Sequence, residues 1–480
     1  MQNALLQTGS PRRRPLSSNI IRSVVYPLWA KRDHPTYAGY LKRFNRTQFL
    51  SPTELRQRQM ELLRIQLLDA YRNVPYYRRK MEEADITPLD IRSFEDLKAI
   101  PILQKKDVQD WNDDLLASNV LPIDRVRNQT GGSTGSPLQF WVDRERFDSR
   151  RASTDRHNAW AGLYPGDWYA HLWGSRFDTK TSTRPSIQWR QRFLYRELTL
   201  NTSLIAEEDL QNYVVLLRRI RPRVMLAYAQ SAVMFAKYCR DNKLDDLSFD
   251  SIITSAEVLM PEQRSLLEAQ FGAQVFNRYG CREVSVIASE CSYGTGLHTN
   301  SDALIVEIQP SPGLPAGTGR VLVTDLLNRS MPLIRYEIGD IASWVDDIPC
   351  PCGRHLPRLQ AIEGRITDFL VTGDGRKISG ISLALLAGDM PEVRQMQFYQ
   401  DDPRKIVLRV VAGRGYGRDA EAELRERLWP YLRGQSEVSV ELVTEIPAEP
   451  SGKFRYVKVG ASLSASNHFE AEPLTNVLAS

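Results

Sequence analysis

A polar, glycine-rich stretch of the chain could hold phosphate. Residues 128–141 read NQTGGSTGSPLQFW, and six consecutive positions supply glycine or hydroxyl groups: Thr130, Gly131, Gly132, Ser133, Thr134 and Gly135. Glycine lets backbone N–H groups approach phosphate oxygens closely. The stretch lacks the Gly-Lys-Ser/Thr ending of the nucleotide P-loop and the Gly-x-Gly-x-x-Gly spacing of dinucleotide-binding proteins. Taken alone, it is equally typical of a surface linker.

A second set of residues could hold a metal ion: Cys291, His298, Cys350 and Cys352. Three thiolates and one imidazole would complete a tetrahedral Zn²⁺ site, although the spacings Cys-x₆-His and Cys-x-Cys differ from those of the common zinc fingers. The alternative is four unrelated residues whose thiols are reduced and lie in loops. Four protein ligands leave no open coordination position, so such a zinc ion would be structural and not catalytic.

Length and charge narrow the class of protein. A chain of 480 residues exceeds the size at which single cores stop growing, which predicts at least two domains. Its 63 Lys and Arg against 58 Asp and Glu give a net charge of +5, spread along the chain, and this does not favour a nucleic-acid partner. No apolar run approaches the roughly 20 residues of a transmembrane helix, and the start does not resemble a secretory signal. We therefore expect a cytoplasmic protein without a transmembrane segment, whose five cysteines are reduced or bind metal.

The apolar pattern predicts the elements that must position these residues. From Pro52 apolar residues recur near a helical period until Val74-Pro75, which indicates a scaffold helix. Between residues 222 and 280, β-branched runs alternate with helical runs, as in an α/β sheet whose strand ends carry the ligand. From Ala303 the strands are separated by Gly and Pro turns, which predicts a smaller β-rich subdomain.

The predicted fold class is α/β, with a large N-terminal α/β domain that includes the β-rich subdomain and a small, mobile C-terminal α+β domain. The last part of the chain has its own pattern: a hairpin with a turn at Asp374-Gly375, two further strands and a helix. We expect a loose N-terminal tail over residues 1–18, the large domain over 19–363, a hinge over 364–367 and the C-terminal domain over 368–480.

Six ordered segments carry a resemblance to a known family. They are TGGSTGSP, TSAEVL, NRYGCREVSVIASEC, RYEIGD, PCPCGRHLPRLQAIEGRITDFLV and PAEPSGKFRY, and with the upstream NVPYYR they extend over residues 75–456. The sequence resembles the adenylate-forming superfamily of acyl-CoA synthetases and adenylation domains. Within that superfamily it is similar to the phenylacetate–CoA ligases, and most of all to the CapK-like members associated with capsule synthesis.

The resemblance implies roles for residues of the large domain. The residues of the Thr130–Gly135 loop would contact the phosphates, and Tyr279, followed by Gly280, would stack on adenine, whose pocket Glu257 would line. Asp340 would accept hydrogen bonds from the ribose hydroxyls, which suits a charged acceptor. Glu283 would help to hold Mg²⁺, a cation that prefers oxygen ligands. Without this context, each residue would be an ordinary core aromatic or a solvated charge.

Two further residues belong to the C-terminal part. Arg365 would contact the ribose at the hinge, and Lys453 would place positive charge where a carboxylate attacks the α-phosphate of ATP; a solvated lysine is the alternative. The sequence departs from the family at two positions. Thr367 stands where relatives often carry a charged hinge residue, and Arg282 replaces a small hydroxyl residue, which puts CoA as the second substrate in question.

The function implied is an adenylate-forming ligase of the acid–thiol type. ATP and a carboxylic acid would give acyl-AMP and pyrophosphate, and CoA would then accept the acyl group. The alternatives are transfer to an amine, a sugar or a carrier-protein thiol, in contact with polysaccharide-synthesis enzymes or a carrier protein, and a nucleotide-binding scaffold without turnover. A phosphotransferase built on the glycine-rich loop would produce ADP instead of AMP.

Two other features have default interpretations. Trp168, Trp173 and Trp189 are expected in the core, with walls of an acyl pocket as the alternative. The segment PRRRP is expected to be a solvated tail, and weak contact with an anionic membrane surface is the alternative.

Overall fold

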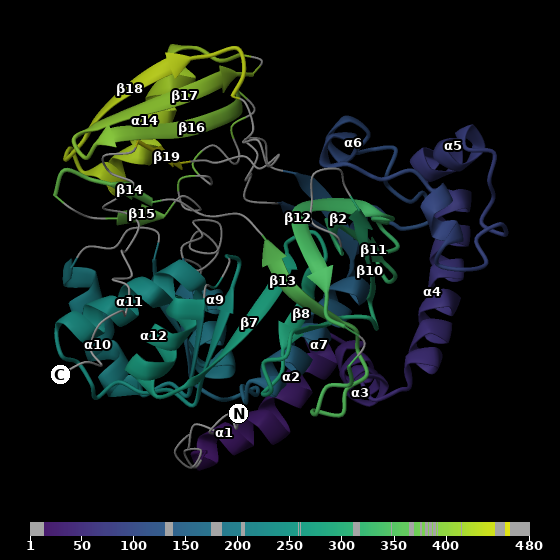
Figure 1. Ribbon diagram of the computed structural model, residues 1–480, viewed down its shortest axis with the longest axis horizontal. Helices are drawn as coiled ribbons and strands as arrows, with labels where there is room; N and C mark the ends of the chain where they lie inside the picture. Colours follow the sequence, from purple (N-terminus) through teal and green to yellow (C-terminus); the bar gives the residue numbers. More distant parts are fainter. Residues whose placement is uncertain are drawn as a thin grey trace, which may run out of the picture.

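The structure is a computed structural model of the 480-residue chain (Figure 1). It describes residues 14–129, 138–173, 185–202, 207–257, 259, 261–310, 317–346, 348–363, 369–374, 377–379, 383, 386, 390, 392–413, 415–446 and 457–460. The glycine-rich loop, Arg365 with the predicted hinge, and Lys453 lie outside these ranges.

A run of helices forms the N-terminal part of the described chain. They are α1 (Leu16–Ile20), the π-helical η1 (Ile21–Val25), α2 (Tyr26–Asp33), α3 (Tyr37–Thr47), α4 (Pro52–Asn73) and α5 (Pro75–Glu83). The prediction of a loose tail to residue 18 is wrong for its last residues, since α1 begins at Leu16. Long-range contacts, which no local pattern reveals, fix this helix. Arg196 donates to the Ser18 hydroxyl at 3.0 Å, and Arg14 pairs with Asp167 at 3.0 Å.

The predicted scaffold helix is confirmed as α4. Ser51 caps it, because its hydroxyl accepts from the backbone of Glu54 and the Glu54 carboxylate accepts from the Ser51 N–H at 2.9 Å. This reciprocal capping box satisfies backbone donors that the first turn leaves without partners. The helix ends at Val74, where the extended backbone precedes Pro75.

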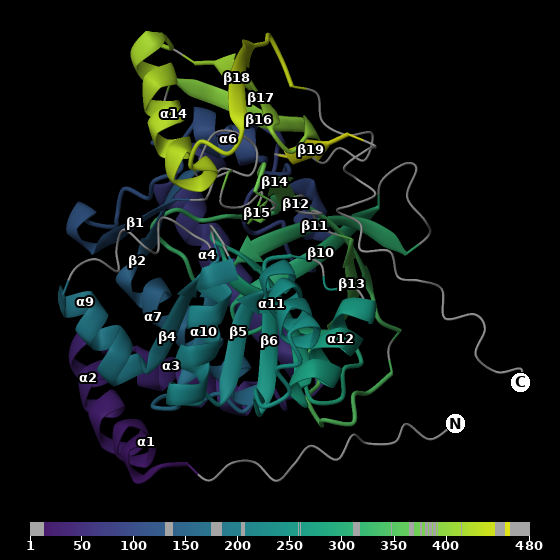
Figure 2. The same cartoon turned by 90° about the vertical axis from the view of Figure 1, so that its left-hand side faces the viewer.

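One eleven-stranded sheet forms the centre of the large domain, in the order β10-β11-β12-β13-β9-β8-β7-β6-β5-β3-β4. Five strands pair in parallel: β3 (Tyr169–Trp173), β4 (Glu197–Asn201), β5 (Val224–Tyr228), β6 (Ser251–Ser255) and β7 (Gln274–Cys281). Helices α10 (Glu207–Ile220), α11 (Ala229–Asp241) and α12 (Pro261–Phe271) connect them and lie together over one face (Figure 2). The predicted α/β architecture is therefore confirmed.

The buried strand β5 shows why these residues form a two-sided sheet. Met225 and Ala227 belong to the core under α10–α12, whereas Val224 packs with Ala161 in a second core on the opposite face. Successive side chains of a strand point to opposite faces, and a strand covered on both faces is therefore apolar throughout.

The remaining six strands of the large sheet pair in antiparallel fashion. They are β8 (Ser285–Glu290), β9 (Leu297–Thr299), β10 (Leu304–Pro310), β11 (Thr318–Asp325), β12 (Tyr336–Trp344) and β13 (Arg358–Glu363). The expected β-rich part beginning near residue 303 corresponds to the hairpin of β10 and β11 and its neighbour β12. Between α5 and β3 lie shorter elements and one long helix: η2 (Asp96–Ala99), α6 (Lys105–Asp110), η3 (Pro122–Asp124), β1 (Arg125–Gln129), β2 (Gln139–Asp143) and α7 (Arg144–Trp160).

The C-terminal part forms its own layers and core. The strands β14 (Phe369–Val371) and β15 (Lys377–Ser379) form a hairpin, as the sequence predicts. Four strands pair in the order β18-β17-β16-β19: β16 (Val393–Asp402), β17 (Lys405–Ala412), β18 (Glu437–Leu442) and β19 (Val457–Val459). Helix α14 (Arg418–Leu432) packs Leu424 and Leu428 against this sheet in a separate hydrophobic core. The residue limits of the domains stay predictions, because the expected hinge lies outside the described ranges.

Candidate active site and metal centre

The carboxyl ends of the parallel strands share one edge, and predicted site residues follow them there. Glu257 comes two residues after β6, and Tyr279 lies near the end of β7. The chain leaves β6 through Ala256, whose φ of +69° is the left-handed conformation that alanine rarely adopts. At the same edge Trp173, the last residue of β3, stacks on Tyr228 of β5 with 4.0 Å between ring centroids. Ligands of α/β sheets bind beyond this edge.

A hydrogen bond joins two of the predicted nucleoside residues. The Tyr279 hydroxyl donates to a carboxylate oxygen of Asp340 at 2.9 Å, and the tyrosine ring is buried. Asp340 lies on β12, so the contact connects the parallel and the antiparallel parts of the sheet. The structure thus brings together an aromatic ring and a carboxylate, which are the groups that stack on a base and accept from ribose hydroxyls.

Glu283 lies in the tight turn between β7 and β8, beside the same strands. The Tyr336 hydroxyl donates to its carboxylate at 3.1 Å. Close packing requires glycine at position 280, because a Cβ there would lie 2.5 Å from the carbonyl oxygen of Ser285. Burial, reinforced by the negative charge of Glu283, raises the pKa of the Cys281 thiol well above its usual range. Cys281 is therefore a neutral packing residue next to the acidic one.

Two arginines of α7 hold the turn that carries Glu283. Arg150 donates to the backbone carbonyl oxygens of Arg282, at 3.2 Å, and of Glu283. Arg146 donates to the carbonyl of Val284 at 3.1 Å, so all three carbonyls of the turn accept from guanidinium groups. Arg146 is itself fully buried in an ion pair with Asp325 at 2.8 Å. Such a pair fixes geometry, since removing either charge would leave the other buried and uncompensated.

The charge on Arg150 persists although the side chain is deeply enclosed. Burial, with the neighbouring charge of Arg146, lowers the pKa of Arg150 to about 10. The guanidinium is therefore still protonated at neutral pH, with its donors directed at the turn. Two hydrogen bonds from a charged donor restrict where the Glu283 carboxylate can lie.

Sequence reasoning missed Arg150 and Tyr336 as supports of the site. Tyr336 is within the RYEIGD segment, so the motif offered a signal for it. Arg150 belongs to the helix RERFDSRRASTDRHNAW, whose many polar residues show no apolar stripe, and nothing in that pattern singles it out. Its role depends on tertiary contacts with residues more than 130 positions away.

The four predicted metal ligands converge in space. The possible ligand atoms of Cys291, His298, Cys350 and Cys352 all lie within 4.8 Å of one another. The Cys291 and Cys350 sulfurs are 3.6 Å apart, and the Cys352 sulfur is 3.4 Å from Nε2 of His298. Zn–S bonds of about 2.3 Å in a tetrahedron separate two sulfurs by about 3.8 Å, so the spacing fits this ion.

The surroundings of the cluster also fit a metal. Nδ1 of His298 lies 3.1 Å from the Leu356 carbonyl, an acceptor for its proton, which directs Nε2 to the thiols. Burial lowers the pKa of His298 to about 4 and keeps the imidazole neutral. Burial also raises the pKa of Cys291 to about 12, so a thiolate there needs a cation beside it. The cluster connects the end of β8, strand β9 and the segment before β13, which suits a structural cross-link.

Across the described part of the chain, no helix combines the length and apolar character needed to cross a bilayer.

Comparisons with known proteins show what the chain is similar to. Residues 370–459 match the family of CapK C-terminal domains. Protein CapK of Staphylococcus aureus is 23% identical over 364 residues, which is 75% of this chain and 79% of CapK. The phenylacetate–coenzyme A ligase of Thermus thermophilus is 28% identical over 405 residues, or 81% of this chain and 86% of that enzyme.

Solved structures show the same fold. The crystal structure of 2-hydroxyisobutyryl-CoA ligase with 2-HIB-AMP and CoA, in the thioesterification state, matches 88% of this chain and 93% of its own with a TM-score of 0.59 and 22% identity. The same ligase in the postadenylation state, with R3-HIB-AMP, gives a TM-score of 0.58 at 21% identity.

The fold is that of the adenylate-forming CoA ligases to which these solved structures belong. Within that class, the chain is a homologue of CapK and of the phenylacetate–coenzyme A ligases. The family resemblance stated from the sequence motifs is therefore confirmed.

Proposed function

We propose that this protein activates a carboxylic acid with ATP, forming acyl-AMP and pyrophosphate, and then transfers the acyl group to coenzyme A. The observation that carries the proposal is the placement of Tyr279, Asp340 and Glu283 at the junction of the two halves of the sheet, where Tyr279 bonds to Asp340 and Glu283 bonds to Tyr336 of the same strand β12. Each has the chemistry that one part of a magnesium–nucleotide complex requires.

The proposed site residues contact different parts of the nucleotide. The Tyr279 ring stacks on adenine, Asp340 accepts hydrogen bonds from the ribose, and Glu257 borders the base. The Glu283 carboxylate supplies an oxygen ligand for Mg²⁺, which prefers such hard donors. Thr130–Gly135, which lie outside the described residues, would contact the phosphates, as the family resemblance implies. These assignments follow from residue type, position and the family resemblance.

The chemistry of the first step calls for positive charge. A carboxylate oxygen of the acid attacks the α-phosphorus of ATP, and the bond to the leaving pyrophosphate breaks. Two anions meet in this step, so a cation placed at the developing charge lowers the barrier. Lys453 supplies that cation from the C-terminal domain, and Arg365 contacts the ribose at the hinge.

The second step is thioester formation with coenzyme A. The names of several relatives, phenylacetate–coenzyme A ligases, support this acceptor. The similarity to CapK and the unusual Arg282 favour a second candidate, which is transfer to an amine, a sugar or a carrier-protein thiol. The two candidates share the adenylation step and differ only in the nucleophile.

We further propose that Cys291, His298, Cys350 and Cys352 bind a structural Zn²⁺ ion. Mutual distances of no more than 4.8 Å and the deep burial of three of the residues support this assignment. The ion takes no part in the reaction, because four protein ligands fill its coordination sphere.

The test is to incubate the purified protein with ATP, Mg²⁺ and a panel of aryl, hydroxy and fatty acids, and to identify the products. Acid-dependent AMP and pyrophosphate are expected. ADP would indicate a phosphotransferase, and ATP binding without turnover of any acid would indicate a scaffold. Offering the acyl-adenylate to coenzyme A and to candidate amines then decides between the two acceptors.

A further inference from the structure

The first helical run exposes an apolar row to solvent. Leu16, Ile20, Val24 and Leu28 are spaced by four residues, and their exposed fractions are 75%, 49%, 51% and 65%. The opposite side of the run is buried, because Tyr26 and Ala30 belong to a core cluster with α3. The helical run is therefore apolar on both sides, and only one side is covered by the described residues of the protein.

The π-helical segment η1 keeps this row straight. In an α-helix of 3.6 residues per turn, a spacing of four advances by about 40° and would spiral around the helix. A π-helix bonds residue i to i+5 and turns less per residue, so η1 reverses part of this drift. The five residues Ile21–Val25 lie in the middle of the row, where they offset part of the rotation between its two ends.

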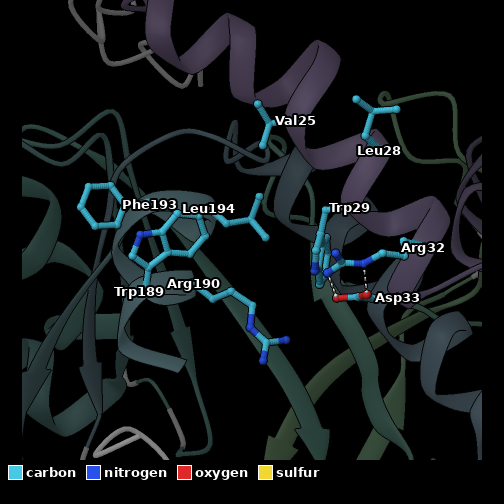
Figure 3. A pocket seen from close by; sticks show the side chains of 9 residues that line it. All are labelled: Val25, Leu28, Trp29, Arg32, Asp33, Trp189, Arg190, Phe193 and Leu194. Atoms are coloured by element: carbon cyan, nitrogen blue, oxygen red, sulfur yellow. Dashed lines mark hydrogen bonds and ion pairs between the residues drawn. The ribbon is translucent and has the colours of Figure 1, made fainter. Parts of the chain in front are cut away.

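A second helix extends the exposed apolar surface. Helix α9 (Pro185–Trp189) continues into the π-helical η4 (Arg190–Tyr195), and Trp189 and Phe193 are 61% and 55% exposed. The default expectation that Trp189 lies in the core is therefore wrong. Between the two runs lies a groove of about 670 Å³, which Figure 3 shows lined by Val25, Leu28 and Trp29 on one side and Trp189 and Phe193 on the other.

Most of the charges near this surface are positive. Lys31, Arg32, Arg190 and Arg192 lie on the same two helical runs, and Asp33 is paired with Arg32 at 2.7 Å. The first 32 residues of the chain contain six Lys and Arg and neither Asp nor Glu. The apolar residues Leu16, Ile20, Val24, Val25, Leu28, Trp189 and Phe193 are here called the N-terminal apolar patch.

We propose that the N-terminal apolar patch binds an anionic lipid bilayer. Aliphatic side chains and two aromatic rings can enter the boundary between headgroups and acyl chains, where tryptophan is favoured. The surrounding cations then contact lipid phosphates, and each adds to the attraction of a negative surface. Charge complementarity selects this occupant, because Lys31, Arg32 and Arg192 are exposed on the same two helical runs as the apolar side chains.

The position of the patch is compatible with turnover at a membrane. In Figures 1 and 2, which share a vertical axis, α1 lies at the bottom and the C-terminal sheet with α14 at the top. Binding through the patch leaves the C-terminal domain clear of the bilayer. The inference concerns where the enzyme acts and is independent of the acid, the acceptor and the nucleotide chemistry.

The apolar contribution is tested by sedimentation of the full-length protein with vesicles of phosphatidylglycerol and phosphatidylcholine. We expect binding to the anionic vesicles, and we expect Leu28→Glu or Trp189→Glu to weaken it about tenfold or more. The matched control is Val215→Glu on α10, where the side chain is 63% exposed outside the patch. Equal binding of the patch variants and the control would overturn the proposal.

The charge contribution is tested separately. Arg190→Glu with Arg192→Glu should abolish binding to anionic vesicles, and about 0.5 M NaCl should weaken binding of the unchanged protein, because salt screens exposed charges. The control pair, Arg56→Glu with Arg64→Glu, reverses two exposed charges on α4. Acid-dependent pyrophosphate release should be unchanged in all variants, which shows that they are folded. Equal binding to pure phosphatidylcholine would contradict the proposal.

A second copy of the chain is the rival occupant. Light scattering that shows a dimer of the unchanged protein and a monomer of Leu28→Glu, with no vesicle binding by either, would assign the patch to self-association and overturn the lipid proposal. A monomer that binds anionic vesicles would support it.

Discussion

The Tyr279 hydroxyl donates a hydrogen bond to Asp340 across 2.9 Å, although three strands separate β7 from β12 in the sheet order. In a flat sheet with strands about 4.8 Å apart, β7 and β12 would be about 19 Å apart. The antiparallel half must therefore curve strongly toward the parallel half. This curvature places the Tyr279 ring beside the Asp340 carboxylate, the two groups that we propose bind one nucleoside.

Replacing Asp340 should weaken the binding of the nucleotide and leave the fold intact. Asp340→Asn removes the charged acceptor for the ribose hydroxyls, and we expect KM for ATP to rise about tenfold or more, because hydrogen bonds to charged groups are worth about 1.5–3 kcal/mol. Tyr279→Phe keeps the ring and should raise KM less. Pyrophosphate exchange at varied ATP concentration measures both. An unchanged KM in Asp340→Asn would remove Asp340 from the ribose site.

Arg150 should act as a positioning residue for Glu283. In Arg150→Lys a single ammonium cannot reproduce the two guanidinium contacts with Arg282 and Glu283, so we expect about a tenfold fall in the exchange rate. The Mg²⁺ concentration needed for half-maximal rate should rise, so that excess Mg²⁺ partly restores the rate. The control is Arg144→Lys on the same helix, where the side chain is exposed and 3.6 Å from Asp124. A loss that added Mg²⁺ never restores would argue for damaged packing instead.

Local patterns predicted the elements of this fold well. The helix from Pro52, the alternating strands and helices around β5 and β6, and the C-terminal hairpin were all visible as periodicity and turn residues. The start of α1 was not, because Ser18 is fixed by Arg196, which lies 178 residues away. Short-range signals cannot report such a contact.

Some residues of the candidate site could be predicted from sequence motifs, and others could not. Tyr279, Glu283 and Asp340 belong to ordered motifs, and the sequence therefore indicated them, whereas Arg150 was missed because its partners are backbone carbonyls. A carbonyl is common to every residue, so no residue type marks it. The proposed zinc ligands show an intermediate case, in which residue types suggested a metal but only the structure supplies the distances.

Removing one metal ligand should destabilise the protein without changing its chemistry. Cys352→Ser is expected to reduce bound zinc from one equivalent to nearly none and to lower the Tm, because the ion connects segments that are distant in sequence. Metal analysis and thermal unfolding provide the measurements. Cys239→Ala changes a buried cysteine outside the cluster and should retain the zinc. Full zinc content in Cys352→Ser would show that this thiol is not a ligand.

The pair of Glu197 and His171 predicts an acid-sensitive contribution to stability. Burial opposes ionisation of Glu197, but the charge of His171 and hydrogen bonds from His171, Tyr169 and Thr199 outweigh it and lower the pKa of Glu197 to about 2. Because the folded pKa is below the unfolded value, this stabilisation is complete above about pH 5 and is lost as the pH falls toward 2.

Glu197→Gln should therefore reduce the stability of the protein most near neutral pH. We expect its free energy of unfolding to be lower than that of the unchanged protein by about 2–3 kcal/mol at pH 7, with the difference shrinking below pH 4. Urea unfolding at several pH values measures both proteins. A difference that stays constant between pH 7 and pH 3 would show that Glu197 does not ionise differently on folding.

Lys453 should be needed for one half-reaction only. Lys453→Ala removes the cation from the adenylation step, and we expect pyrophosphate exchange to fall about 10²–10³-fold, as for other groups that stabilise developing charge. Consumption of a supplied acyl-adenylate with the acceptor should continue, because no second anion then attacks phosphorus. Lys458→Ala, which changes an exposed lysine on β19, is the matched control and should leave both half-reactions unchanged. Equal losses in the two half-reactions of Lys453→Ala would mean that the lysine supports the C-terminal domain as a whole and not the attack on ATP.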